Sequence, residues 1–248
     1  HDIIEPIDIE VDEIYNLACP ASPLHYQSDP IFTTKTSVIG TLNLLDMANK
    51  YDSKYLFTST SEVYGDPLVH PQKENYLGNV NPIGLRSCYD EGKRCAESIV
   101  FDYHRKFKTK VKIARIFNTY GPNMAENDGR VVSNFVISSL KNNEITVFGD
   151  GSQTRCFCYV SDMVDGLINL MNTNGKVTGP INIGSDVEMT VLDLAKKVKD
   201  LVQSNSKIIF KELPTDDPKI RKPDLNNAKK YIDWEQKVAL EDGLKETI

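Results

Sequence analysis

The chain has 248 residues, of which 40% are hydrophobic and 26% charged, an ordinary composition for a globular protein with a main domain and a small lobe. Its net charge of -6, with no long basic run, argues against nucleic acid as the main partner. No apolar stretch is long enough to span a membrane, and the five cysteines, without a C-x-x-C pair, predict neither a disulfide framework nor a zinc or other metal site.

Short apolar runs alternate with longer amphipathic stretches along most of the chain. The runs are rich in β-branched and aromatic residues, which is typical of buried strands, whereas the stretches have helical spacing. The predicted strands span 14–18, 55–60, 111–117 and 180–184, and the predicted helices span 31–50, 86–108, 131–141, 160–172, 190–203 and 225–232. This alternation predicts an α/β fold with a doubly wound parallel sheet.

The character of the sequence changes near residue 120, where "YGPNMAENDGR" predicts a loop. We expect residues 1–122 to form the main domain, with residues 156–185 returning to its sheet. Residues 123–155 and 186–248 are expected to form a smaller C-terminal α/β lobe for the substrate. A polar, proline-marked loop, "ELPTDDPKIRKPD", precedes the last predicted helix.

Tyr89 and Lys93 form a Y-x-x-x-K pair, whose spacing places both side chains on one face of a helix. A tyrosine hydroxyl is a poor base at neutral pH, but a neighbouring ammonium stabilises the phenolate and lowers its pKa. Such a phenolate can remove a hydroxyl proton while a hydride leaves the same carbon. The alternative is a solvated pair on a helix surface, and a single pair of this kind is near chance expectation.

Polar side chains follow two of the predicted strands. "YLFTSTSEVYG" ends an apolar run in Thr60, Ser61 and Glu62, and "IFNTYGP" places Asn118 directly after another run. Ligands of open α/β sheets bind beyond the carboxyl ends of the strands, so these side chains are candidates for substrate contacts. Capping of the strand end by hydroxyl groups, or support of the loop by the asparagine, remains the alternative.

Two arginines stand in segments rich in turn residues. Arg155 follows two glycines in "GDGSQTRCF", and Arg221 lies among carboxylates in "DDPKIRKPD". Arginine suits bidentate binding of phosphate, although surface arginines in local ion pairs are more common. The chain contains neither G-x-G-x-x-G nor G-x-x-G-x-x-G, so its own motifs do not predict a dinucleotide site.

Eight segments in order, "LACPASPLHY", "TSTSEVYGDP", "NPIGLRSCYDEGKRCAE", "ARIFNTYGPNM", "DGRVVSNF", "GDGSQTRCF", "YVSD" and "RKPD", resemble the UDP-glucuronate decarboxylases, a family of the extended short-chain dehydrogenase/reductase superfamily. The resemblance implies a Rossmann-like main domain whose N-terminal βαβ unit, with its glycine motif, would precede His1. The opening segment is not a signal peptide and is typical of a domain interior, which also predicts upstream residues.

The resemblance implies a decarboxylase that converts UDP-glucuronate into UDP-xylose through a 4-keto intermediate, with NAD as a bound cofactor. The implied catalytic residues are Thr60, Ser61, Glu62, Tyr89, Lys93 and Arg221. The implied NAD contacts are Asp2, Ile3, Leu17, Cys19, Thr36, Tyr89, Lys93, Thr119 and Arg130, and the implied substrate contacts are Lys35, Asn118 and Arg155.

The same resemblance suggests a homodimer in which helices near 36–50 and 86–108 pair into a four-helix bundle. It also suggests a cytoplasmic protein, or one in the Golgi lumen if an anchor lies upstream.

Other functions within the superfamily remain open. A 4,6-dehydratase typically carries Asp-Glu where this chain has Ser61-Glu62, and a 4-epimerase would not need Arg221. A bifunctional apiose/xylose synthase or a decarboxylase that releases a 4-keto pentose is also possible. A different class is a catalytically incompetent fragment or pseudoenzyme that serves as a dimerisation partner, against which the intact candidate residues speak.

Overall fold

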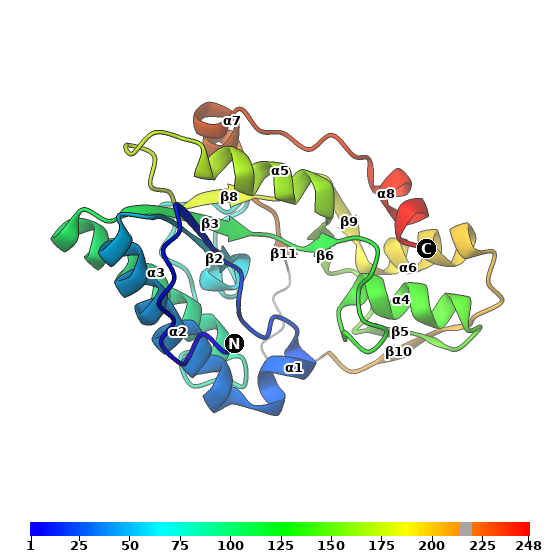
Figure 1. The fold of residues 1–248 in the computed structure, drawn as a ribbon. Helices are drawn as coiled ribbons and strands as arrows, with labels where there is room; N and C mark the ends of the chain where they lie inside the picture. The colour runs from blue at the N-terminus through cyan, green and yellow to red at the C-terminus, as the bar shows by residue number, and fades with distance from the viewer. Residues whose placement is uncertain (214–219) are drawn as a thin grey trace.

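A parallel sheet of four strands forms the centre of the larger half of the molecule (Figure 1). The computed structural model describes residues 1–213 and 220–248, so the predicted loop "ELPTDDPKIRKPD" lies partly outside the described residues. The strand order is β1-β2-β3-β8, and each neighbouring pair is parallel. The strands are β1 (Glu13–Asn16), β2 (Lys54–Thr60), β3 (Lys110–Ile116) and β8 (Ile181–Ile183). The predicted parallel sheet is confirmed.

Helices cover both faces of this sheet (Figure 1). On one face lie α2 (Pro30–Tyr51) and α3 (Ser87–Phe107), and on the other lie α5 (Val160–Met171) and α7 (Asn226–Ile232). Successive residues of a strand point to opposite faces, so Leu56 packs in the core beneath α5 while Phe57 packs in the core beneath α2 and α3. The sheet is therefore wound on both sides, as the alternation of strands and helices predicted.

Local sequence explains where the two long helices begin and end. The Asp29 side chain accepts a hydrogen bond from the backbone N–H of Phe32, and Pro30 occupies the first turn of α2. The helices end at Asp52 and Lys108, each with a positive φ. In contrast, α3 begins after Arg86 without a side-chain cap, which leaves the arginine side chain available for contacts elsewhere.

The smaller half contains short strands and three helices around a second core, which includes Phe135, Ile145, Val198 and Leu244 (Figure 1). Its helices are α4 (Val131–Leu140), α6 (Val191–Val202) and α8 (Leu240–Thr247). Its strand pairs are β5 (Ile145–Phe148) with β10 (Ile208–Lys211), and β6 (Thr154–Cys156) with both β9 (Glu188–Thr190) and β11 (Ile220–Arg221).

The remaining short elements follow the strands of the main sheet or lie between the two halves in the chain order. They are α1 (Pro23–Ser28), the 3-10 helix η1 (Ser61–Tyr64), β4 (Thr119–Tyr120) and β7 (Cys158–Tyr159). The domain boundaries expected from the sequence stay a prediction. Trp234 packs with Ala228 and Ile232 in the core beneath β3 and β8, so this C-terminal segment covers one face of the main sheet.

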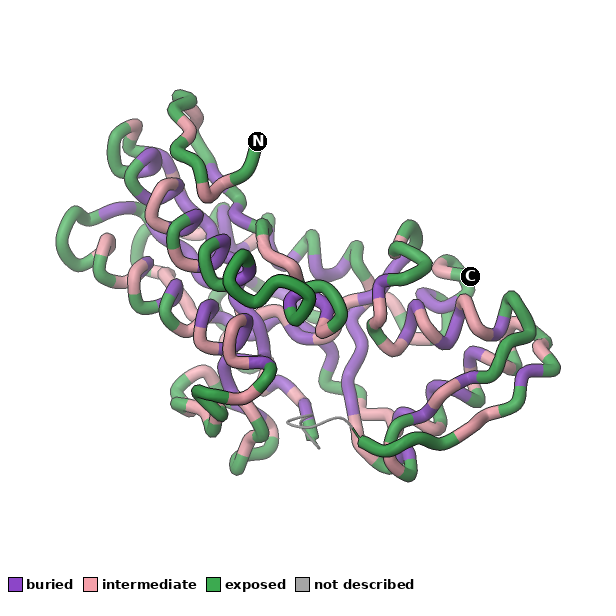
Figure 2. The backbone as a smooth tube through the Cα atoms, turned by 90° about the horizontal axis from the view of Figure 1, so that it is seen from below, coloured by how far each residue is buried: buried purple, intermediate pink, exposed green. Residues whose placement is uncertain are grey.

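Burial follows the same organisation (Figure 2). The strands of the main sheet are buried along most of their length, whereas exposed residues gather on the outer helices and the loops. Throughout the described ranges, none of the helices combines the length and the apolar character that a bilayer crossing requires. The described residues also hold no group of three or more His, Cys, Asp or Glu side chains that could bind a metal ion.

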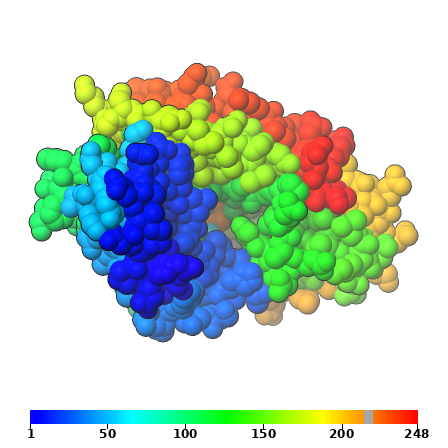
Figure 3. Space-filling view, viewed as in Figure 1, coloured from blue at the N-terminus to red at the C-terminus, as the bar shows by residue number. Residues whose placement is uncertain are grey.

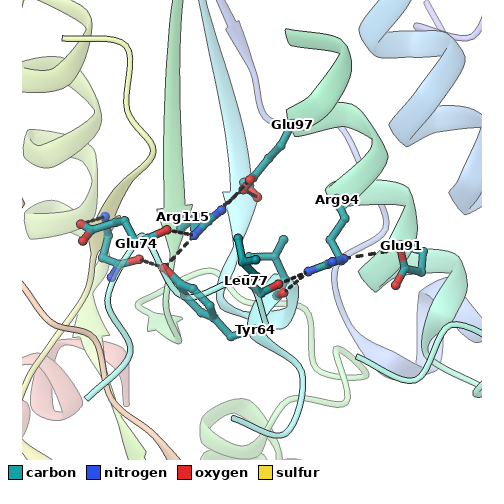
Figure 4. Close-up of polar contacts among 10 residues, drawn as sticks. Tyr64, Glu74, Leu77, Glu91, Arg94, Glu97 and Arg115 are labelled. Carbon is teal, nitrogen blue, oxygen red and sulfur yellow. Dashed lines mark hydrogen bonds and ion pairs between the residues drawn. The ribbon is translucent and has the colours of Figure 1, made fainter. Parts of the chain in front are cut away.

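A largely buried polar network fixes α3 against the sheet (Figure 4). Glu97 of α3 accepts hydrogen bonds from Ser59 Oγ at 2.5 Å and from Arg115 Nη2 at 2.7 Å. Arg115 also donates to the Tyr64 hydroxyl at 3.0 Å, and that hydroxyl donates to Asn182 Oδ1 at 2.7 Å. The network joins α3 to β2, β3 and β8, and so fixes the position of the helix relative to the ends of these strands.

Replacing Glu97 with alanine is expected to lower the free energy of unfolding by about 3–5 kcal/mol, because Arg115 would remain largely buried without its counter-charge. Equilibrium unfolding in urea measures the change. The control is Asp102→Ala on the same helix, which removes an exposed ion pair with Arg105 and should cost about 1 kcal/mol at most. Equal losses in the two variants would contradict the importance of the buried network.

Candidate active site

The candidate site begins at the carboxyl end of β2. Thr60 ends this strand, and its side-chain oxygen accepts a hydrogen bond from the backbone N–H of Glu62 at 3.2 Å. This cap turns the chain into η1, in which Ser61 and Glu62 are both buried. The hydroxyl group of Thr60 and the carboxylate of Glu62 therefore lie together at the carboxyl end of β2, where ligands of parallel sheets bind.

Tyr89, on the first turn of α3, approaches this strand end. Its hydroxyl group lies near the Thr60 side chain, and its ring stacks on Tyr26 of α1 with centroids 5.0 Å apart and planes 8° apart. Burial, reinforced by the nearby Cys19, raises the pKa of Tyr89 above its usual range, although the Thr60 side chain acts in the opposite direction. Tyr89 is consequently a buried, protonated phenol in this state of the protein.

Lys93 lies one turn further along α3 and is also buried. Its Nζ donates to the backbone carbonyl of Thr58 at 2.9 Å and lies 4.6 Å from the centre of the Phe57 ring. Burial lowers the pKa of Lys93, while Cys19 and Glu97 oppose that shift. Burial dominates the pKa of Tyr89 in this structure, so the expected lowering of that pKa by the ammonium is not seen here.

Glu62 lies between two arginines. Its carboxylate is 2.9 Å from Arg86 Nη2 and 2.8 Å from Arg221 Nη2, and all three side chains are at most 10% exposed. The contacts are close ion pairs, but Oε2 of Glu62 and Nη2 of Arg221 lack a well-aligned hydrogen bond. Burial alone would raise the pKa of Glu62, but Arg221, Arg86 and Arg155 outweigh it and hold the pKa below its usual value.

The smaller half brings two arginines to the same place. Arg221 of β11 is the register partner of Arg155 of β6, and both are buried. Nη1 of Arg221 donates to Oδ1 of Asn118 at 3.2 Å, and Asn118 lies two residues after the end of β3. Glu62, Asn118, Arg155 and Arg221 therefore form one cluster, although 159 residues separate Glu62 from Arg221. The fold unites candidates that the sequence placed in four separate segments.

Other predicted NAD contacts lie beside this cluster. Cys19 Sγ is 3.3 Å from Ser37 Oγ, and it acts electrostatically on Tyr89 and Lys93. Leu17 follows β1 and is 57% exposed, so an apolar side chain is open at that strand end. Thr36 is buried on α2 and donates to Phe32, and Thr119 donates to the carbonyl of Phe117.

The last predicted residues lie further out. Asp2 is exposed and accepts from the N–H of Ile4, while Ile3 packs its side chain over Gly40 of α2. Arg130 pairs with Asp128 at 2.6 Å and acts electrostatically on Tyr89. Lys35 is exposed on α2. None of these four takes part in the ion pairs of Glu62.

Sequence reasoning missed three residues of the site. Arg86 pairs with Glu62, and Tyr26 stacks on Tyr89. Asp90 is buried close to Glu62 and Arg86. Arg86 stands three residues before Tyr89, so helical spacing could have pointed to it. The sequence offers no comparable signal for Tyr26, which reaches the site from another helix.

The doubly wound sheet and the Thr60, Tyr89 and Lys93 group at its strand ends define an α/β protein of the extended short-chain dehydrogenase/reductase type. A family model described as GDP-mannose 4,6 dehydratase matches residues 3–247. UDP-glucuronic acid decarboxylase 3 of Arabidopsis thaliana is 59% identical over 98% of this chain and 71% of its own length. UDP-glucuronic acid decarboxylase 1 of Danio rerio is 53% identical over 100% of this chain and 59% of its own length.

A solved structure agrees with these matches. The crystal structure of a UDP-glucuronic acid 4-epimerase from Bacillus cereus, in complex with UDP-glucuronic acid and NAD, superposes with a TM-score of 0.86 and 26% identity over 95% of this chain and 74% of that one. The chain belongs to the UDP-glucuronic acid decarboxylase family of the extended short-chain dehydrogenase/reductases. It spans between 54% and 71% of the length of the curated relatives that it matches.

Removing either partner of the Glu62–Arg86 pair is expected to destabilise the fold by about 3 kcal/mol, because the remaining charge stays buried. A double-mutant cycle with Glu62→Gln and Arg86→Met, measured by chemical unfolding, should show that the double variant loses clearly less than the sum of the singles. Arg105→Met, at an exposed pair on α3, is the control for loss of an arginine. Strictly additive losses would show that the two side chains do not interact.

Proposed function

We propose that the protein containing this chain converts UDP-glucuronate into UDP-xylose and carbon dioxide through a 4-keto intermediate, with NAD as a bound cofactor. The observation that carries the proposal is the position of Glu62 and its arginines beside Thr60 and Tyr89. This arrangement puts a base for a sugar hydroxyl next to cationic groups suited to a sugar carboxylate. The names of the close relatives support the same reaction.

The residues present fit NAD. The exposed Leu17 offers an apolar surface at the end of β1, next to the segment that carries Cys19, and Tyr89 and Lys93 are buried at the same edge of the sheet. We assign the NAD site to these residues together with Asp2, Ile3, Thr36, Thr119 and Arg130. Bound NAD would supply the acceptor for the hydride of the sugar carbon and the source of the hydride that is returned.

In the proposed reaction, Tyr89 acts as a phenolate, so it must first release to solvent the proton that it holds in the state described above. The phenolate then removes the proton of the sugar's 4-hydroxyl, and Thr60 orients that hydroxyl. The resulting ketone is β to the carboxylate, so loss of carbon dioxide leaves an enolate whose negative charge the former ketone oxygen carries. Protonation of the enolate carbon gives the 4-keto pentose, and return of the hydride to its carbonyl carbon, with the proton held by Tyr89, gives UDP-xylose. Arg221 and Arg86 hold the carboxylate before it is lost and stabilise negative charge afterwards. Ser61 and Glu62 position the carboxylate and its neighbouring carbons, while Asn118, Arg155 and Lys35 hold the UDP part.

A hollow on the surface is consistent with access for a sugar nucleotide. In the space-filling view it lies between the N-terminal segments, drawn in blue, and the green segments near the middle of the chain (Figure 3). The solved epimerase from Bacillus cereus holds UDP-glucuronic acid and NAD together, which supports the same pair of ligands here.

We also propose that the protein is a homodimer in which α2 and α3 pair with their copies. Ile31 and Ile39 of α2 are 66% and 37% exposed, so this helix has apolar side chains that a partner helix could cover. For the compartment we propose the cytoplasm, or the Golgi lumen if an upstream anchor is present.

The test of the proposed reaction is incubation of the full-length protein with UDP-glucuronate, followed by chromatography of the products. UDP-xylose is the expected product, whereas an epimerised uronate or unchanged substrate would refute the proposal.

Tyr89→Phe is expected to abolish turnover, with a loss of at least about 100-fold, because it removes the proposed base. Its circular dichroism and its affinity for UDP should stay close to those of the parent, and normal turnover would exclude Tyr89 as the base.

Glu62→Gln is expected to reduce kcat by at least about 100-fold while changing the affinity for UDP by less than about threefold, since the side chain is assigned to the sugar carboxylate and not to the nucleotide. Turnover assays and calorimetric titration with UDP separate the two effects. Equal losses of kcat and UDP affinity would remove the assigned role.

A further inference from the structure

Asp90 is a buried carboxyl group that the proposed reaction does not use. It follows Tyr89 on the first turn of α3, and its residue is only 6% exposed. Its backbone N–H donates to the carbonyl of Arg86 at 3.0 Å. Oδ1 of its side chain is shielded from solvent and has no hydrogen-bond partner among the described residues. A buried acceptor of this kind is costly unless the group is neutral or is used by the site.

The groups that face Asp90 come from four elements. Glu62 of η1 is the charged group with the largest effect on it, followed by Arg86 at the start of α3 and Arg221 of β11, while Glu91 on α3 itself has a smaller effect. The phenols of Tyr26 on α1 and Tyr89 on α3 also feel its charge.

Both arginines that face Asp90 are already engaged. Arg86 and Arg221 lie 2.9 and 2.8 Å from the Glu62 carboxylate. A second ionised carboxylate would therefore share these cations with Glu62, and its Oδ1 atom has no hydrogen-bond donor among the described residues. Two carboxyl groups that share one buried site retain a proton between them, as like charges in a low dielectric cannot both ionise readily.

We propose that Asp90 is a positioning residue of the site: Glu62 and Asp90 carry one negative charge between them, with the proton on Asp90, and this keeps the Glu62 carboxylate centred between Arg86 and Arg221. Burial, and then the charge of Glu62, raises the pKa of Asp90 to about 8 even though both arginines oppose the shift. At neutral pH and without substrate, the two arginines therefore face one ionised carboxylate, Glu62, and not two. Ionisation of Asp90 draws them away from it and loosens the site.

The part of the inference that concerns turnover rests on the proposed function, but the protonation of Asp90 can be tested without it. An aspartate in an unfolded chain ionises near pH 4. In the folded chain Asp90 keeps its proton until about pH 8, so the folded state binds the extra proton and its stability falls as pH rises through this interval. Asp90→Asn cannot titrate, and it keeps the size of the side chain.

The first experiment compares melting temperatures of the full-length protein and its Asp90→Asn variant from about pH 5 to about pH 8. The variant should gain stability relative to the parent steadily as the pH rises. The control is Asp102→Asn, at an exposed carboxylate of the same helix, whose curve should stay parallel to that of the parent. A difference between parent and Asp90→Asn that does not change with pH would overturn the inference.

The second experiment measures turnover of UDP-glucuronate against pH for the parent, Asp90→Asn and Asp90→Ala, with NAD bound. The parent should lose activity above about pH 8, and Asp90→Asn should lack this loss. Asp90→Ala should show a lower kcat than Asp90→Asn with little change in KM, because only the amide preserves the neutral partner of Glu62. An alkaline limb in Asp90→Asn identical to that of the parent would refute the positioning role. If the parent does not turn over UDP-glucuronate, the proposed function fails while the melting experiment still decides the state of Asp90.

Discussion

A buried carboxylate between two buried guanidinium groups is the interaction on which the rest of the site depends. Glu62, Arg86 and Arg221 come from η1, the start of α3 and β11. Each charge is costly to bury alone, and the ion pairs offset that cost only while all three elements stay in place. Because β11 belongs to the smaller half and the other two elements belong to the main sheet, the charge balance of the site requires both halves to be packed together.

The helix that carries the proposed base is held from several directions. Lys93 of α3 donates to the carbonyl of Thr58, and its neighbour Arg94 donates to the carbonyls of Val63 and Leu77 at 2.8 Å (Figure 4). One turn further on, Glu97 accepts from Ser59 of β2 and Arg115 of β3. These contacts restrict sliding and rotation of the helix over the sheet. Packing and hydrogen bonds along α3 therefore fix the position of the Tyr89 phenol. A fixed position of the base is a requirement for efficient proton transfer.

Much of the fold was predictable from the sequence, because the strands of the main sheet and its long helices have clear apolar periods. The strand predicted at 180–184 joins the main sheet as β8, as expected for a segment that returns to it. Elements such as β11, with two residues, have no period to detect, and their existence depends on partners far away in the chain. The same limit applies to the site. Thr60 and Tyr89 stand in recognisable motifs. In contrast, the ion pair between Glu62 and Arg86 and the raised pKa of the Tyr89 phenol both depend on tertiary packing, which the sequence does not show.

The long separation between Glu62 and Arg221 has a consequence for biosynthesis. As the chain leaves the ribosome, β2 and α3 emerge well before β11, and N-terminal parts generally begin to fold first. A nascent chain can thus align Thr60 with Tyr89 while Glu62 still lacks one of its cations. Arg221 leaves the ribosome only after the four strands β1, β2, β3 and β8, so the electrostatic completion of the site follows the synthesis of the whole main sheet.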